Sequence, residues 1–343
     1  MASGYHRSTT SNGSLLDGRR PTPEQRHRPH VNGRRLFQTG VLVVGLAGLA
    51  LAVASTVDDA SEHVMPGPGA WAVAAVLALA AILTSGRAWV ALFHDTLQDR
   101  PHRMRFEGNY YVSQLTKYLP AGGAVQAASQ VSMAAAAGVP LGRVALAFPV
   151  SAVGSIAAGA TIGSGLALVS DIPMWARVLA LLGLFSPALL HRRFLAGVLA
   201  ICRRFVRRIP APDRLPSQRS ILAFYAWAVV SIGCTAGAYT VLLQSVSDEA
   251  SPGVVFVAYA MSWTVGFLAV PLPAGIGVRE AVLVACLPGV GTAPLIAASL
   301  AHRLLAIGAE VIAALGTKLA GRSASVPSPP TSQAEEVHDV IAP

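Results

Sequence analysis

The sequence predicts an all-α fold, a polytopic bundle of about seven or eight membrane-spanning helices with one or two re-entrant or broken segments. Hydrophobic residues make up 53% of the 343 residues and charged residues only 13%, about half the charged share of a soluble domain. Several apolar runs are long enough to cross a ~30 Å hydrocarbon core. The charges between these runs are also segregated by sign. This composition excludes a soluble enzyme, a disordered chain and a nucleic-acid-binding domain, despite a net charge of +9.

The two ends of the chain differ from the apolar middle. Residues 1–35 are rich in Arg, Ser, Gly and Pro, and residues 321–343 are rich in Ser, Pro and acidic residues. Such compositions bury too little apolar surface to fold. We therefore expect a disordered basic cytoplasmic tail over 1–35, a transmembrane domain over 36–320 and a second disordered tail over 321–343.

The apolar runs give the helices in order. They cover about 36–57, 69–86, 144–170, 174–190, 220–246, 253–271 and 292–317, with a shorter stretch at about 281–289. Most meet the length of ~17–25 residues that a spanning helix requires. Gly154, Gly159, Gly163 and Gly165 suit close helix packing in lipid.

The loops predict the orientation. Segments 58–68 and 247–252 hold acidic residues and no Lys or Arg, whereas 191–219 is rich in Arg. By the positive-inside rule the N-terminus and the 191–219 loop are cytoplasmic, in the plasma (inner) membrane, and an inward-running last helix leaves the C-terminus cytoplasmic. Residues 194–208 are amphipathic and basic, which fits either a helix on the inner leaflet or a charge cluster that only sets topology.

Segment 104–140 is neither apolar enough to span nor polar enough for a plain loop. A helix over 107–118 places four polar side chains on one face, namely Tyr110, Gln114, Lys117 and Tyr118. Pro120 ends that helix, and Gly122 and Gly123 permit a sharp turn into a second short helix. The pattern fits a re-entrant hairpin or a hairpin lying at the interface.

Segment 270–290 is the second irregular region. Helix-breaking residues precede a charged pair at the start of a short helix: Pro271, Pro273, Gly275 and Gly277, then Arg279 and Glu280. Broken helices with charges at their ends form many transport sites. A cytoplasmic turn whose glutamate caps a helix explains the same residues.

The last helix carries two charges, Arg303 and Glu310, seven residues apart and therefore on one face. A charge at mid-membrane costs ~2.5–3.5 kcal/mol. We therefore expect this face to point into the bundle or a watery cavity, either on a substrate path or as a lock between helices.

These segments resemble the lysylphosphatidylglycerol synthase transmembrane-region family, also called the flippase-like domain family. The resembling residues are the stretch NYYVSQLTKYLPAGG over 109–123, the element VPLPAGIGVRE ending at Glu280, and Arg303. The resemblance implies an inner-membrane protein with re-entrant segments, whose relatives move charged or glycosylated lipids between leaflets. Larger relatives carry a soluble aminoacyl-transferase domain; about 25 residues follow the last helix here, so we expect no lysyl-lipid synthesis by this chain.

The first functional expectation is a lipid translocase, or its accessory, that is not itself an enzyme. Lys117, Arg279 and Arg303 would bind a phosphate-containing or glycosylated head group. Tyr110, Tyr111 and Tyr118 would donate hydrogen bonds, and Gln114, Glu280 and Glu310 would complete the path. The partners expected are phosphatidylglycerol-like or polyprenyl-phosphate-linked lipids, and envelope-biosynthesis enzymes; no nucleic acid, cofactor or metal is expected.

Two alternatives belong to other classes. An intramembrane lipid-modifying transferase would need paired carboxylates, and Asp95 and Asp99 beside His94 are the nearest approach. A non-catalytic scaffold for envelope biosynthesis would use the basic tails for docking. The sequence lacks the phosphate-binding pattern GxxxxGK[ST], so we expect no ATP-driven pumping.

Overall fold

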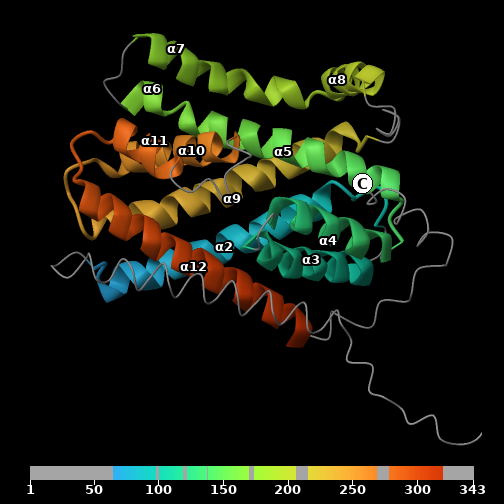
Figure 1. Cartoon of the computed structure of the whole chain (residues 1–343), viewed down its shortest axis with the longest axis horizontal. Coiled ribbons are helices and arrows are strands. Elements are labelled where there is room, and N and C mark those ends of the chain that lie inside the picture. The colour runs from blue at the N-terminus through green and yellow to red at the C-terminus, as the bar shows by residue number, and fades with distance from the viewer. Residues whose placement is uncertain are drawn as a thin grey trace, which may run out of the picture. The chain divides into compact units, whose positions relative to one another are not determined.

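The computed structural model describes residues 65–97, 100–118, 122–136, 138–169, 174–205, 215–268 and 278–319, and these ranges contain helices and no strand (Figure 1). The all-α prediction is therefore confirmed for this part of the chain. The elements are α2 (Pro68–Ala91), α3 (Arg100–Gln114), η1 (Leu115–Tyr118), α4 (Gly122–Ala136), α5 (Leu141–Gly163), α6 (Leu166–Val169), α7 (Met174–Leu182), η2 (Gly183–Leu190), α8 (Arg192–Phe205), α9 (Gln218–Gln244), α10 (Pro252–Leu268), α11 (Val278–Cys286) and α12 (Thr292–Leu319).

Four of these helices are long and apolar enough to cross a membrane, namely α2, α5, α9 and α12. A fifth span results if the bent pair Ala180–Leu190 and Arg192–Ile201 is counted as one. The described residues thus support a multi-pass membrane protein, but not the predicted seven or eight spans. The predicted run 36–57 lies outside the described residues.

Two predicted runs are not described as one long α-helix. The run 253–271 is described as α10 up to Leu268, a helix of 17 residues, and positions 269–271 lie outside the described residues. The run 174–190 divides into α7 and the 3₁₀ helix η2, which contains Pro187. Proline removes an N–H donor and obstructs the preceding α-helical turn. The apolar run is therefore continuous in sequence but changes helix type at Gly183.

Close helix contacts hold the bundle together. The glycines of α5 face neighbouring helices: a Cβ on Gly154 would meet the Phe224 ring of α9 at 2.5 Å, and one on Gly163 would meet the Met261 backbone of α10 at 3.3 Å. The Ser186 hydroxyl of η2 donates to the Ala157 carbonyl of α5 at 2.9 Å. These contacts confirm that the Gly-rich run serves helix packing, since the absence of a side chain lets backbones approach.

Large apolar side chains also face outward from the spans. Val76 of α2 is 69% exposed and Ile312 of α12 is 61% exposed, and Leu83, Trp227, Val230 and Leu315 are exposed as well. A soluble protein rarely exposes large apolar patches. These faces suit contact with lipid tails.

One end of the bundle is basic. We call it the basic end and define it as the place where α2 ends and where α5, α8 and α9 begin. One buried cluster joins these termini and includes Phe93, Val144, Leu195 and Ile221. Its exposed arginines are Arg87, Arg143, Arg192, Arg193 and Arg219. The acidic residues Asp248 and Glu249 come shortly after the other end of α9, a helix of 27 residues. Basic and acidic residues therefore lie at opposite ends of this helix, as the sequence predicts.

Candidate functional site

The segment after α2 forms a pair of helices, α3–η1 and α4, as the sequence predicts. The first helix begins at Arg100, not at 107. Pro101 is its second residue, a position where the missing N–H has no intrahelical partner in any case. The structure describes η1 up to Tyr118 and α4 from Gly122, and residues 119–121 lie outside the described residues. Gly122 and Gly123 thus open α4, whereas we predicted them in the turn itself.

Helix α3 lies between α2 and α12. Near its middle, the Glu107 carboxylate accepts from Arg87 of α2 at 3.3 Å and from the Tyr111 hydroxyl at 2.5 Å. A Cβ on Gly86 would lie 2.5 Å from the Tyr111 ring, so α2 and α3 touch where α2 has no side chain. The Tyr110 hydroxyl shares a hydrogen bond with Ser85. Two of the three predicted site tyrosines, Tyr110 and Tyr111, therefore anchor the hairpin to α2.

The phenol groups of Tyr110 and Tyr111 stay protonated. Burial raises the pKa of Tyr110 above its ordinary value, and the hydrogen bond shared with Ser85 opposes that shift. Burial also raises the pKa of Tyr111, and the neighbouring Glu107 carboxylate adds to the effect. Neither group ionises near neutral pH, since a buried phenolate is unfavourable.

The hairpin reaches α12 with its charged end. Lys117 of η1 forms an ion pair with Glu310 of α12, whose side chain is 6% exposed against 30% for Lys117. Glu310 is one of the charges that the sequence predicts to face inward, and this is confirmed. Gln114 lies about one helical turn before Lys117 and is also buried. Tyr118, the next residue after Lys117, is the last residue of η1.

The second irregular segment ends in α11, which begins at Val278 and carries Glu280 in its first turn. The predicted charged pair at a helix start is therefore confirmed. Glu280 forms an ion pair with Arg303 of α12, and the two side chains are 29% and 32% exposed.

Arg279 of α11 packs closely against α10. A Cβ on Gly266 would lie 2.5 Å from its Cγ, and its guanidinium carbon is 5.9 Å from the centre of the Trp263 ring. The Arg279 Nε is buried and has no hydrogen-bond partner among the described residues. A buried guanidinium donor of this kind is suited to an anionic oxygen.

Helix α12 carries these contacts as a regular series on one face. Thr317 packs against Gly108 of α3 at 3.1 Å, measured to a Cβ built on the glycine, and Glu310 pairs with Lys117. Arg303 pairs with Glu280. Seven residues separate successive members, which is roughly 10 Å along a helix axis. Lys117, at the end of the first helix of the hairpin, thus contacts α12 about 10 Å further along its axis than Gly108, near the middle of α3, does.

A buried polar group beside this face escaped the sequence analysis. The Tyr259 hydroxyl of α10 lies 3.3 Å from Nδ1 of His302, and both residues are buried. The Tyr259 ring also stacks on Tyr239 of α9 at 4.6 Å. An imidazole inside a spanning run is itself a signal for function, so His302 could have been identified from the sequence. Tyr259 could not, because it lies in an apolar run where a tyrosine does not stand out.

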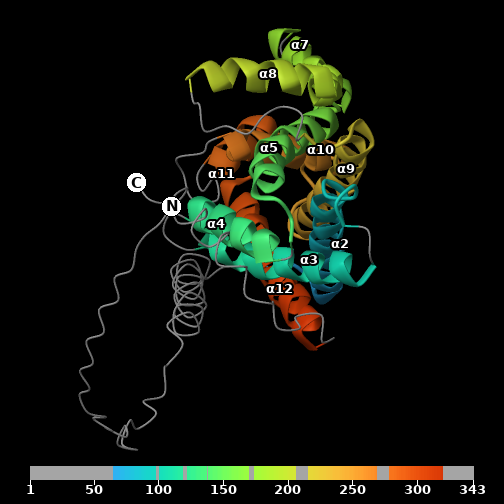
Figure 2. The same ribbon diagram turned by 90° about the vertical axis from the view of Figure 1, so that its right-hand side faces the viewer.

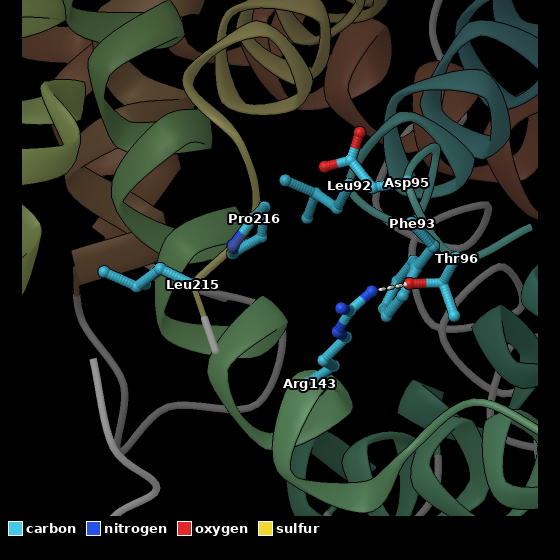
Figure 3. A pocket seen from close by; sticks show the side chains of 7 residues that line it. All are labelled: Leu92, Phe93, Asp95, Thr96, Arg143, Leu215 and Pro216. Carbon is cyan, nitrogen blue, oxygen red and sulfur yellow. Dashed lines mark hydrogen bonds between the residues drawn. The ribbon is translucent and has the colours of Figure 1, made fainter. Parts of the chain in front are cut away.

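A small hollow lies at the basic end, lined by Leu92, Phe93, Asp95, Thr96, Arg143, Leu215 and Pro216 (Figure 3). Its volume of about 50 Å³ holds one or two waters and no lipid head group. Arg143 donates to the Thr96 hydroxyl there. Asp95 accepts from the Ser217 amide at 3.3 Å and from the Ser220 hydroxyl at 3.4 Å, so it holds in place the start of α9, where Ser217 is the N-cap.

Several predicted features lie outside the described residues: Asp99, Pro120, Pro271, Pro273, Gly275 and Gly277. Among the described residues, no group of three or more His, Cys, Asp or Glu side chains is arranged to hold a metal ion.

The family described as the lysylphosphatidylglycerol synthase TM region matches residues 37–314 of the chain. The matched range includes every charged residue of the α12 series. No curated protein matches the chain.

Proposed function

Since the chain belongs to the family of the lysylphosphatidylglycerol synthase TM region, we propose that it is a translocase, or an accessory of translocation, for an envelope lipid whose head group carries a phosphate or a sugar. The chain is an integral membrane protein of a family linked to lipids. The more specific transport role rests on the charged series of α12.

The observation that carries the proposal is the pair of ion pairs on one face of α12. Each joins a spanning helix to an irregular segment, Lys117 of η1 to Glu310 and Glu280 of α11 to Arg303. An intramembrane charge is costly unless it is paired or serves a path. The two pairs hold charges of α12 against the two segments that we propose line a head-group path.

The pairs suggest how a head group would be accommodated. Phosphate oxygens make the same charge-assisted hydrogen bonds to a guanidinium or an ammonium as a carboxylate does. A lipid phosphate would therefore replace Glu280 at Arg303, or Glu310 at Lys117, without leaving a cation unpaired. Arg279 adds a buried Nε that no described residue satisfies.

The proposal extends to partners and location. We place the chain in the plasma membrane, with phosphatidylglycerol-like or polyprenyl-phosphate-linked lipids as its ligands, and in a transport role rather than an enzymatic one. The basic end would face the cytoplasm by the positive-inside rule. A cysteine replacing exposed Arg219 should then react only with reagent on the cytoplasmic side, and one replacing Asp248 only with reagent outside; reversal of either would contradict this orientation.

Reconstitution tests the transport role. The purified chain would be placed in liposomes with a fluorescent phosphatidylglycerol or a fluorescent polyprenyl phosphate, and a membrane-impermeant quencher would report the fraction that changes leaflet. We expect faster exchange than in protein-free liposomes, and a large loss of rate in Arg303→Ala and in Arg279→Ala.

A matched control separates a path role from a loss of folding. Arg219→Ala removes an exposed arginine away from α12 and should leave the rate unchanged. The double variant Lys117→Glu with Glu310→Lys keeps an ion pair but reverses its direction, so it should stay folded and still transport poorly. Full activity of the reversed pair, or no exchange by the native chain with either lipid, would sink the proposal.

A further inference from the structure

We propose that α8 is a docking surface for acidic lipid head groups, and that it lies in the interface of the same bilayer that the spans cross. The inference concerns a part of the molecule far in sequence from the α12 series. It does not depend on whether the chain transports lipid.

The direction of α8 is the first support. The segments Ala180–Leu190 and Arg192–Ile201 meet at an angle of 85°. In Figure 1, α5 and α9 run across the view while α8 is seen nearly end-on, and in Figure 2, turned by 90°, α8 runs across the view. A helix perpendicular to spanning helices lies parallel to the membrane plane.

The position of α8 is the second support. The Arg192 amide donates to the Gln218 side chain at 2.7 Å, and that side chain donates to the Leu190 carbonyl at 3.4 Å. Leu195 enters the buried cluster that joins the starts of α5 and α9. The helix is thus fixed at the basic end, at the level where spanning helices begin.

The exposed face of α8 is apolar. Phe194, Val198 and Ile201 are 48%, 42% and 57% exposed, and their spacing of four and then three residues places them on one stripe. Leu195 and Leu199 occupy a different stripe, which packs on the bundle. The outer stripe is a second apolar face that the described part of the chain does not cover.

Charge identifies what covers that face. Arg192 and Arg193 are exposed, α8 also carries Arg203 and Arg204, and its sequence contains no acidic residue. An apolar stripe flanked by arginines is the pattern of helices that sit between head groups and acyl chains. The preceding η2 exposes Phe185 and Leu189, so the apolar surface continues from the helix that runs beside α5. An acidic lipid surface matches both features.

Site-directed labelling of the full chain tests the proposal. In a background with Cys202, Cys234 and Cys286 replaced by serine, a nitroxide would be attached to Ile201→Cys or, as the matched control on another side of the helix, to Ala200→Cys. In nanodiscs of phosphatidylglycerol and phosphatidylcholine, the label at 201 should be accessible to oxygen and protected from a water-soluble relaxation agent. The label at 200 should show the reverse.

Charge variants test the head-group preference. A fluorophore at position 201 should be quenched more strongly by spin-labelled phosphatidylglycerol than by spin-labelled phosphatidylcholine. The preference should fall roughly five-fold for each arginine removed in Arg192→Gln and Arg193→Gln, which corresponds to ~1 kcal/mol per residue. The lysine variants at both positions keep the charge and should keep the preference.

Three outcomes would overturn the inference. A label at 201 that is freely accessible to the water-soluble agent means that the stripe faces water. A protected label that neither lipid quenches means that a protein covers it. Equal quenching by both lipids in the native chain means that α8 does not select acidic head groups.

Discussion

Removing Lys117 should destabilise the protein more than removing its partner, Glu310. The Glu310 side chain is 6% exposed, whereas that of Lys117 is 30% exposed. Lys117→Met leaves a buried carboxylate without its ammonium, while Glu310→Gln leaves an ammonium that water already reaches. The two halves of one ion pair are therefore expected to have unequal effects.

The magnitude follows from that exposure. Breaking a fully buried pair costs ~3–5 kcal/mol, and a mid-membrane charge costs ~2.5–3.5 kcal/mol on the insertion scale. Because Lys117 is partly exposed, we lower the expectation to about 2–4 kcal/mol for Lys117→Met and about 1 kcal/mol for Glu310→Gln. The double variant should cost less than the sum of the two, with a coupling energy of about 1–3 kcal/mol.

The assay is a double-mutant cycle on the unfolding of the purified protein in a lipid-detergent mixture, with Arg219→Gln as an exposed control. Arg303→Met and Glu280→Gln provide an internal comparison, because their side chains are 32% and 29% exposed and should have similar effects. Equal costs for Lys117→Met and Glu310→Gln, or additivity of the two within about 0.5 kcal/mol, would refute the reasoning.

Two further predictions concern glycines. Gly86→Ala places a Cβ 2.5 Å from the buried Tyr111 ring and should cost about 1–3 kcal/mol, seen as a lower thermal unfolding temperature, whereas Gly308→Ala meets no atom within 4 Å and should leave that temperature unchanged or higher; equal shifts would contradict the packing. Gly266→Ala would displace the flexible Arg279 side chain, so we expect slower lipid exchange in liposomes with little change in unfolding temperature. Normal exchange by a folded Gly266→Ala protein would argue against a role for that arginine.

The sequence predicted the hairpin and the charged helix start because local chemistry decides them. Proline at 120 cannot continue a helix, and the structure describes one helix up to Tyr118 and the next from Gly122, on either side of this residue. Arg279 and Glu280 follow a Pro- and Gly-rich segment, and α11 begins at Val278. The number of spans was harder to predict, because an apolar run such as 174–190 does not reveal a change from α-helix to 3₁₀ helix.

Sequence by itself determined that this is a helical membrane protein with a basic end, because the length of each apolar run and the sign of the loop charges can be read directly from the residues. It also determined that Arg303 and Glu310 share a face of one helix. Only the tertiary structure decided that each pairs with a different irregular segment, 193 residues away for Lys117 and 23 for Glu280. Periodicity places a side chain on a face, but which partner meets that face depends on how the helices pack.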